Sequence, residues 1–265
     1  MWFNSLMRSW YISVAVIALL LLGIFLAGDS LAKMAWDNEY PGLALVLNRS
    51  DSELAMQLGN YYFNGGAYDL DKAEKAYLRA ISIDSKIIGA NYQLARIYFV
   101  KGEDDKAIEY INKEIEINPQ SLRSLYVRGL IHGSSGRLAK AEEDFKRFVE
   151  WSPTEWAGYN DLAWVLAKER KYKEAEEVLK IALEKVDRAK DNPWLWNSLG
   201  VSQLNQNDNL KAKKSFEKAR ETSKILTLKE WQKAYPGNDP AESEKAFEDF
   251  KIAIEKNIEA SLPVR

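Results

Sequence analysis

One pattern repeats along this chain with a period near 34 residues, and it constrains the fold more than any other feature. Five alanines recur at intervals of 34, 34, 34 and 37 residues: Ala73, Ala107, Ala141, Ala175 and Ala212. Each follows a segment built around a small residue, and these small residues are Gly59, Ala95, Gly129, Ala163 and Gly200. A fixed period in this range is typical of stacked supersecondary units, because one unit alone cannot bury its apolar face. The sequence therefore predicts a repeat array rather than two globular domains.

Each repeat has the pattern of two helices joined by a short turn. In the first segment, apolar residues flank the small residue at the i, i+3, i+4 spacing of one helix face, and the small residue lets a neighbouring helix approach closely. In the second segment, an aromatic or aliphatic residue follows the alanine by four positions, as Phe145 follows Ala141. Turn residues such as Gly102 separate the two segments, and Pro119 and Pro153 stand where the next helix would begin.

These residues resemble the tetratricopeptide repeat family, in which the small residue, the tyrosine three positions later, the glycine turn, the alanine, its aromatic partner and the closing proline have this spacing. Five repeats cover about residues 52–224. The period continues to Ala246, Phe250 and Ala253, so 225–265 is predicted as a degenerate sixth repeat and C-terminal capping helix. The resemblance implies an all-α fold, a right-handed α-solenoid of helix hairpins.

Near the N-terminus, the residues from Ser9 to Gly28 are all uncharged. At about 1.5 Å per residue, a helix of this length would span roughly 30 Å, the thickness of a bilayer core. We therefore expect a short tail at 1–8, a transmembrane helix at 9–28, and a juxtamembrane connector and cap at 29–51. The alternative is a cleaved signal peptide, because Ser30-Leu31-Ala32 supplies small residues at a plausible cleavage spacing, although the apolar region is longer than usual.

The flanking charges favour a cytoplasmic N-terminus, because Arg8 and the α-amino group precede the segment, whereas Lys33 follows it among acidic residues. The expectation is a single-pass membrane protein whose repeat part lies on the periplasmic or another extracytoplasmic side.

The composition excludes several kinds of chemistry. The 265-residue chain has no cysteine and one histidine, His132, which excludes disulfides, thiolate nucleophiles and zinc sites built from cysteine or several histidines. His132 replaces the packing tyrosine of the third repeat, so we interpret it as structural. With 37 basic and 39 acidic residues, the net charge of −2 gives no field that would recruit nucleic acid. No phosphate-binding loop or nucleophile elbow occurs. We therefore expect no enzyme, metal, cofactor or nucleic-acid partner.

In solenoids of this family the first helices line a concave surface, and the positions three before and one after the small residue point into it. The resemblance therefore implies that a partner binds to these groove residues: Met56, Asn60, Tyr92, Arg96, Tyr126, Asn160, Trp164, Trp194 and Asn197. Aromatic rings add contact area at low entropy cost, and amides can bond an extended backbone. The alternative is that several of these rings only pack between neighbouring first helices.

The leading hypothesis is a non-enzymatic, membrane-anchored scaffold or adaptor that binds a partner peptide segment or amphipathic helix in the groove. The resemblance further implies a role in an envelope assembly or translocation complex. Family members that clamp a C-terminal carboxylate begin with Lys and have Asn one turn later. Here Met56 stands in place of the Lys before Asn60, so chaperone tails are not expected. The alternative is a self-associating, homo-oligomeric membrane protein without a peptide ligand, in which Gly23 and Ala27 help to seat a second copy.

Overall fold

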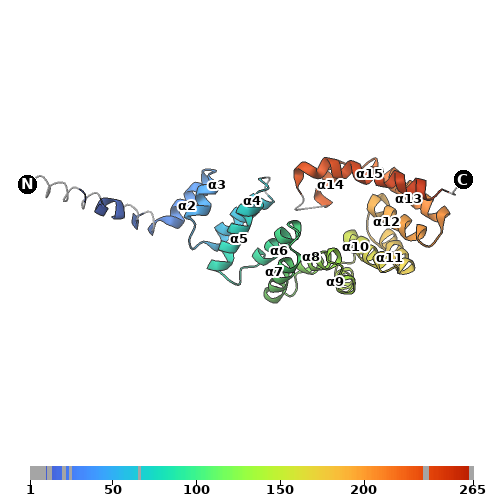
Figure 1. The fold of residues 1–265 in the computed structure, drawn as a ribbon, viewed down its shortest axis with the longest axis horizontal. Coiled ribbons are helices and arrows are strands. Elements are labelled where there is room, and N and C mark those ends of the chain that lie inside the picture. The colour runs from blue at the N-terminus through green and yellow to red at the C-terminus, as the bar shows by residue number, and fades with distance from the viewer. Residues whose placement is uncertain are drawn as a thin grey trace, which may run out of the picture. The chain divides into compact units, whose positions relative to one another are not determined.

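The computed structural model describes residues 10, 14–19, 22–23, 26–64, 67–234 and 239–262, and the regular elements in these ranges are all helical. Two compact units divide the chain at residues 90 and 91 (Figure 1). The helices of the first unit are α2 (Gly28–Asp37), α3 (Pro41–Leu47), α4 (Ser52–Phe63) and α5 (Leu70–Ile83). The next helix, α6 (Ala90–Val100), begins at the boundary, and the helices after it belong to the second unit.

The second unit continues as helix pairs joined by short turns. These are α7 (Asp104–Ile117), α8 (Leu122–Ser134), α9 (Leu138–Trp151), α10 (Trp156–Lys168), α11 (Tyr172–Lys185), α12 (Pro193–Leu204) and α13 (Asn209–Ser223). A 3-10 turn, η1 (Ala189–Asp191), precedes α12. The final elements are α14 (Leu228–Ala234), the 3-10 turn η2 (Pro240–Glu242) and α15 (Ser243–Ala260). The expected all-α fold is confirmed for the described residues.

Local sequence signals fix where several of these helices begin and end. The Asp51 side chain accepts a hydrogen bond from the backbone N–H of Leu54 and thereby caps α4. Asn192 caps α12 in the same way, with Pro193 in its first turn. Gly102 and Gly136 have φ angles of 75° and 74° in the turns after α6 and α8, a left-handed conformation that glycine adopts without strain.

The small residue of each first helix has a direct structural role. At Gly129 on α8, a Cβ atom would lie 2.8 Å from the Phe145 ring of α9, and at Gly200 on α12 it would lie 2.5 Å from the Phe216 ring of α13. Such distances leave no room for a methyl group, so the ring of the second helix packs directly on the backbone of the first. Gly59 is covered by the Tyr77 ring in the same way in the first unit.

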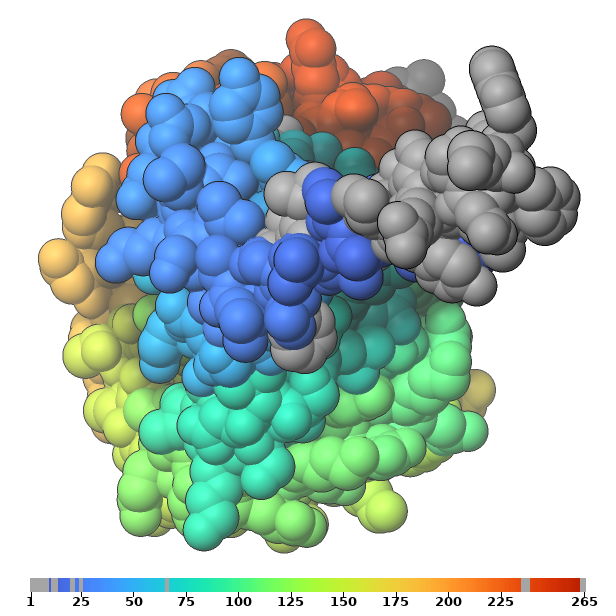
Figure 2. Space-filling model, turned by 90° about the vertical axis from the view of Figure 1, so that its left-hand side faces the viewer, coloured from blue at the N-terminus to red at the C-terminus, as the bar shows by residue number. Residues whose placement is uncertain are grey.

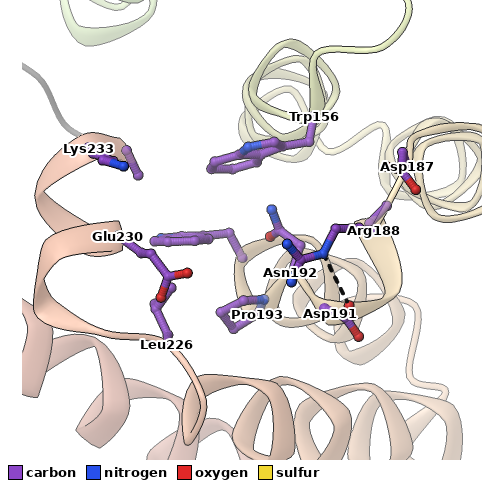
Figure 3. A pocket seen from close by; sticks show the side chains of 12 residues that line it. Trp156, Asp187, Arg188, Asp191, Asn192, Pro193, Leu226, Glu230 and Lys233 are labelled. Carbon is purple, nitrogen blue, oxygen red and sulfur yellow. Dashed lines mark ion pairs between the residues drawn. The ribbon is translucent and has the colours of Figure 1, made fainter.

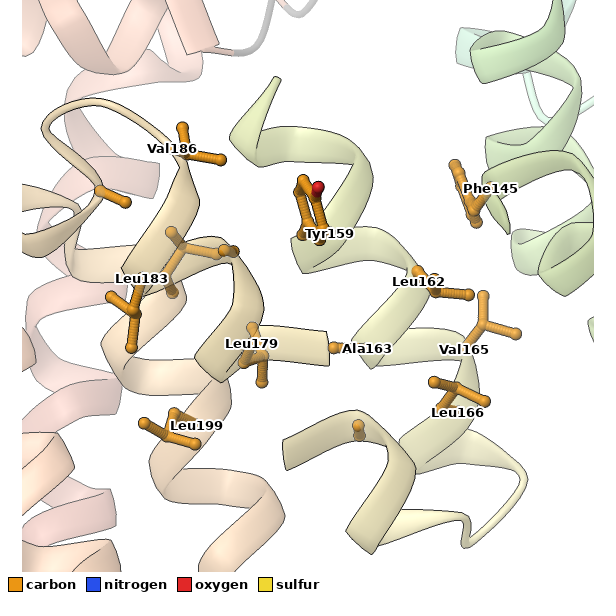
Figure 4. Close-up of a cluster of buried hydrophobic side chains, with 14 of the residues drawn as sticks. Phe145, Tyr159, Leu162, Ala163, Val165, Leu166, Leu179, Leu183, Val186 and Leu199 are labelled. Atoms are coloured by element: carbon orange, nitrogen blue, oxygen red, sulfur yellow. The ribbon is translucent and has the colours of Figure 1, made fainter. Parts of the chain in front are cut away.

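Neighbouring pairs bury one another's apolar faces. Figure 4 shows one core cluster that joins Phe145 of α9, Leu162 and Leu166 of α10, Leu179 of α11 and Leu199 of α12. All five side chains are at most 4% exposed. Because this cluster draws on two successive hairpins and the start of a third, no hairpin could form it alone.

In the first unit, α2 and α3 form a helix pair that packs on α4 (Figure 2, blue). Ala32 and Ala44 are fully buried in a cluster with Leu58. The Asp29 side chain accepts hydrogen bonds from the backbone N–H groups of Arg49 and Ser50, at 2.6 and 3.0 Å, and from the Ser50 hydroxyl. These bonds tie the start of α2 to the segment before α4, and they lower the pKa of Asp29.

The predicted membrane anchor is not supported. Within the described ranges, no helix has the length and apolar character needed to cross a bilayer. The expected span at 9–28 lies partly outside the described residues, and its last residue, Gly28, opens α2. That helix has ten residues, includes Asp29 and Lys33, and buries Ala32 against protein, whereas a span requires about 20 predominantly apolar residues. The expected single-pass localisation, with an extracytoplasmic repeat part, is therefore wrong.

The C-terminal helices differ from the register expected for a sixth repeat. Ala246 and Ala253 align with the buried alanines of the earlier repeats, yet both are exposed. Instead α15 buries Phe247, Ile254 and Ile258, and the two isoleucines pack in a cluster with Phe216 of α13. Contacts with α13, rather than the repeat spacing, therefore decide which residues of α15 are buried.

We predict that Gly200→Ala destabilises the protein, because the added methyl group would overlap the Phe216 ring. Overpacking of this kind costs about 1–3 kcal/mol, more than alanine regains through a helix propensity advantage of about 1 kcal/mol. Chemical denaturation measures the change in the free energy of unfolding. The double variant Gly200→Ala with Phe216→Leu should lose less stability than the sum of the two single variants, and simple additivity would contradict the proposed contact.

Candidate functional site

The nine side chains expected to bind a partner are distributed over both units. Met56 and Asn60 lie on α4 in the first unit. Met56 is half-buried and packs against the cluster that contains Ala55 and Ile87. Asn60 is exposed, and its Oδ1 atom accepts a hydrogen bond of 2.8 Å from the Tyr77 hydroxyl. Both residues therefore contribute contacts to the fold of the first unit.

The amide of Asn160 belongs to a chain of hydrogen bonds that crosses three first helices. The Tyr126 hydroxyl of α8 donates to Asp161 Oδ2 of α10 at 2.5 Å. Asn160 Nδ2 donates to Asp161 Oδ1 at 3.2 Å, and the Ser198 hydroxyl of α12 donates to Asn160 Oδ1 at 2.8 Å. We call these four residues the polar ladder. Because the ladder already uses the carbonyl oxygen of Asn160, this amide ties helices together.

Burial raises the pKa of Asp161 in this ladder to about 6, although the hydrogen bonds from Tyr126 and Asn160 favour its ionised form. Desolvation therefore dominates the titration of this carboxyl group.

The two expected site residues on α12 contact the C-terminal helices of the same chain. Trp194 is 8% exposed and stacks on Trp156 with ring centroids 5.0 Å apart, and on Trp231 of α14 and Phe250 of α15 at 5.7 Å each. Asn197 Oδ1 accepts a hydrogen bond of 3.0 Å from Asn257 Nδ2 of α15. These contacts cover this part of the first-helix surface.

The remaining residues are rings and cations carried by α6, α8 and α10. Trp164 is 42% exposed and lies against α8, where a Cβ atom on Gly133 would be 2.9 Å from its ring. Lys168 Nζ lies 5.4 Å from the centroid of the Trp164 ring, and the Arg96 guanidinium lies 5.7 Å from that of Tyr92. We call the following set the aromatic-cationic face: Tyr92, Arg96, Arg123, Tyr126, Trp164 and Lys168.

Four contributors to this region were not among the predicted site residues: Arg123, Asp161, Lys168 and Ser198. Helical periodicity carries a signal for the two cations, since Arg123 precedes Tyr126 by three positions and Lys168 follows Trp164 by four. Asp161 and Ser198 have no comparable signal, because their partners lie on other repeats.

A separate pocket of about 380 Å³ lies beside the aromatic stack (Figure 3). Trp156 and Trp194 line it together with the segment around η1, where Arg188 and Asp191 form an ion pair of 3.8 Å. Glu230 and Lys233 of α14 complete the lining. The charges here are mixed. No group of three or more acidic, histidine or cysteine side chains that could hold a metal ion occurs within the described part of the chain.

The single histidine lies in the helix core. His132 is 7% exposed on α8, and burial lowers its pKa, so the imidazole is neutral at physiological pH. Its nearest charged neighbours include Asp144 and Arg128, which pair with each other through hydrogen bonds of 2.6 and 2.9 Å.

Comparison with known proteins supports the repeat interpretation. Two family models, both described as tetratricopeptide repeat, match residues 88–121 and 126–193. BBSome complex member BBS4 of Bos taurus is 26% identical over 178 residues, which are 67% of this chain and 32% of that protein. This chain thus spans about a third or less of the first curated relatives it matches.

Solved structures show the same fold. A tetratricopeptide repeat protein from Parabacteroides merdae has a TM-score of 0.59 at 19% identity, covering 91% of this chain and all of that chain. YrrB, described as a TPR protein with an unusual peptide-binding site, has a TM-score of 0.56 at 19% identity, covering 70% of this chain and 93% of that chain.

The chain therefore carries tetratricopeptide repeats, and its fold is an all-helical tetratricopeptide-repeat solenoid. Proteins of this type are generally non-enzymatic scaffolds for protein-protein interaction.

We predict that Asp161 makes the protein more stable as the pH falls from 7 to about 4. The Asp161 pKa of about 6 in the folded state exceeds the ordinary value of 3.8. At a pH above about 6 the carboxyl group is ionised, and the folded state is less stable for it. At about 1.4 kcal/mol per pKa unit, the penalty at pH 7 is about 2–3 kcal/mol. Chemical denaturation at pH 7 and at pH 4 measures the change in the free energy of unfolding.

Other carboxyl groups also titrate in this range, so the comparison is made with Asp161→Asn, which keeps an oxygen acceptor for Tyr126. This variant should be more stable than the parent at pH 7 and similar to it at pH 4. Parallel pH profiles for the two proteins would contradict the assignment.

Proposed function

We propose that this protein holds a partner protein by binding a peptide segment or amphipathic helix of that partner on the aromatic-cationic face. The observation that carries the proposal is Trp164. Its ring is 42% exposed on α10, whereas Leu162, Val165 and Leu166 of the same helix are at most 4% exposed. Tryptophan, tyrosine and arginine supply most of the binding energy at protein interfaces, and this face presents all three.

The similar proteins agree with this proposal. YrrB shares the fold and is described as having a peptide-binding site, and BBS4 is described as a member of a complex. A helix bound on a repeat surface uses apolar anchors at i, i+3, i+4 and i+7, and the exposed Trp164 ring and the partly buried Tyr92 and Tyr126 rings suit such anchors.

A second candidate function is self-association, which an apolar surface on α2 and α3 favours. Met34, Tyr40, Leu43 and Val46 are between 52% and 74% exposed on or next to these two helices. Exposed apolar side chains grouped in this way are typical of protein interfaces. Sedimentation of the full chain and of the double variant Leu43→Glu with Val46→Glu tests self-association. A parent protein that sediments as a monomer excludes this function.

For the main proposal, we predict that a photo-crosslinking amino acid at position 164 captures a partner protein in the cells that produce this chain. Trp151 on α9 gives a matched control, because it is 41% exposed and lies on a second helix. The same probe at position 151 should not capture that partner. Adding Tyr92→Ala should weaken capture at position 164 about tenfold, since an aromatic anchor of an interface contributes 1 kcal/mol or more.

Equal capture at positions 164 and 151, or capture at 164 that does not respond to Tyr92→Ala, would contradict the proposal. Circular dichroism of each variant confirms that the helices remain folded.

A further inference from the structure

We infer that the partner segment bound by the aromatic-cationic face carries carboxylate groups on both sides of a short apolar run. This inference rests on the proposed function and adds the chemistry of the partner. Three features of the second unit support it: the asparagine amides are hydrogen-bonded within the chain, two cations have no acidic partner among the described residues, and these two cations lie far apart along the helices.

The asparagine amides of the first helices are already engaged. Asn160 is bonded to Ser198 and Asp161, and Asn197 to Asn257. Recognition of an extended backbone through these amides would require breaking bonds that join neighbouring helices. The rings and cations of the face can recognise side chains without disturbing these bonds.

Two cations of the face have no acidic partner among the described residues. Arg123 is exposed and forms no ion pair with any residue that the structure describes, and the same holds for Lys168. Several lysines on or next to the second helices of the same unit pair with carboxylates. Lys171 lies 2.7 Å from Glu142, and Lys180 lies 2.8 Å from Glu176.

The acidic residues confirm this contrast. Hydrogen bonds from Lys146 and Lys171 hold the pKa of Glu142 at about 2. On the first helices, the acidic group beside the face is Asp161, which is bonded to Tyr126 and is partly protonated near pH 6. The positive charges of Arg123 and Lys168 therefore remain available to a ligand carboxylate.

The repeat spacing sets the distance between these two cations. Arg123 opens α8 at the repeat position that residue 157 occupies on α10, while Lys168 ends α10. Eleven residues of helix span about 16 Å, so the cations stand at opposite ends of the two helices. The rings of Tyr126 and Trp164 lie between them. A helical partner segment of about three turns, with an apolar middle and an acidic residue near each end, matches this arrangement.

The test is selection from a random dodecapeptide phage library on the full chain. We expect enriched peptides in which aspartate or glutamate flanks apolar or aromatic residues, and their binding should be lost in Trp164→Ala. Arg123→Glu with Lys168→Glu should weaken a selected synthetic peptide at least tenfold. Replacing its acidic residues by Gln or Asn should weaken binding to the parent by a similar factor.

Lys140→Glu with Lys173→Glu is the matched control, because it makes the same change in net charge at exposed residues of α9 and α11. It should change the affinity by less than twofold. Selected peptides that need Trp164 but bind equally well after loss of their acidic residues would overturn this inference and leave the proposed function intact. If no enriched peptide depends on Trp164, both are wrong.

Discussion

In three of the helix pairs, an aromatic ring packed on a glycine sets the distance between the two helices. Phe145 covers Gly129 and Phe216 covers Gly200 so closely that a methyl group would not fit. Interiors packed at this density resist both added and removed volume. Because the two helices of such a pair are held at a fixed spacing, the neighbouring helix pair packs on a surface of defined shape. The core cluster that joins successive hairpins forms at this surface. The position of α8, which carries Arg123 and Tyr126, depends on this contact.

Polar groups on the first helices reinforce that arrangement. The polar ladder joins α8, α10 and α12 through Tyr126, Asp161, Asn160 and Ser198, and it includes a carboxyl group whose ionisation is costly where it lies. Buried polar networks of this kind specify which neighbour a helix accepts. In the proposed function the roles are divided: the amides hold neighbouring helices together, while exposed groups such as Trp164 and Lys168 are the ones that would contact a partner.

The helix pairs could be predicted from the sequence because the small residue and its ring are local features that recur at a fixed period. The buried face of α15 could not be predicted in this way. Ala246 has the expected spacing, yet contacts with α13 decide which residues of α15 are buried. The hydrogen bonds of the asparagine side chains could not be predicted from the sequence either, since the partners of Asn160 and Asn197 lie 38 and 60 residues away. The predicted anchor at 9–28 is not supported for a different reason: among the described residues no helix is long and apolar enough to cross a bilayer, and Gly28, its last residue, opens the ten-residue helix α2.

In the proposed complex, a ligand meets rings and cations while the first-helix amides stay hydrogen-bonded within the chain. The most direct measurement is an NMR titration of the ¹⁵N-labelled full chain with a peptide that it binds, following the Trp164 indole N–H and the Asn160 side-chain amide. The account predicts that the indole signal shifts in proportion to occupancy while the amide signal keeps its position. A large shift of the amide with an unchanged indole would show that the ligand is recognised through the polar ladder, and would contradict the account.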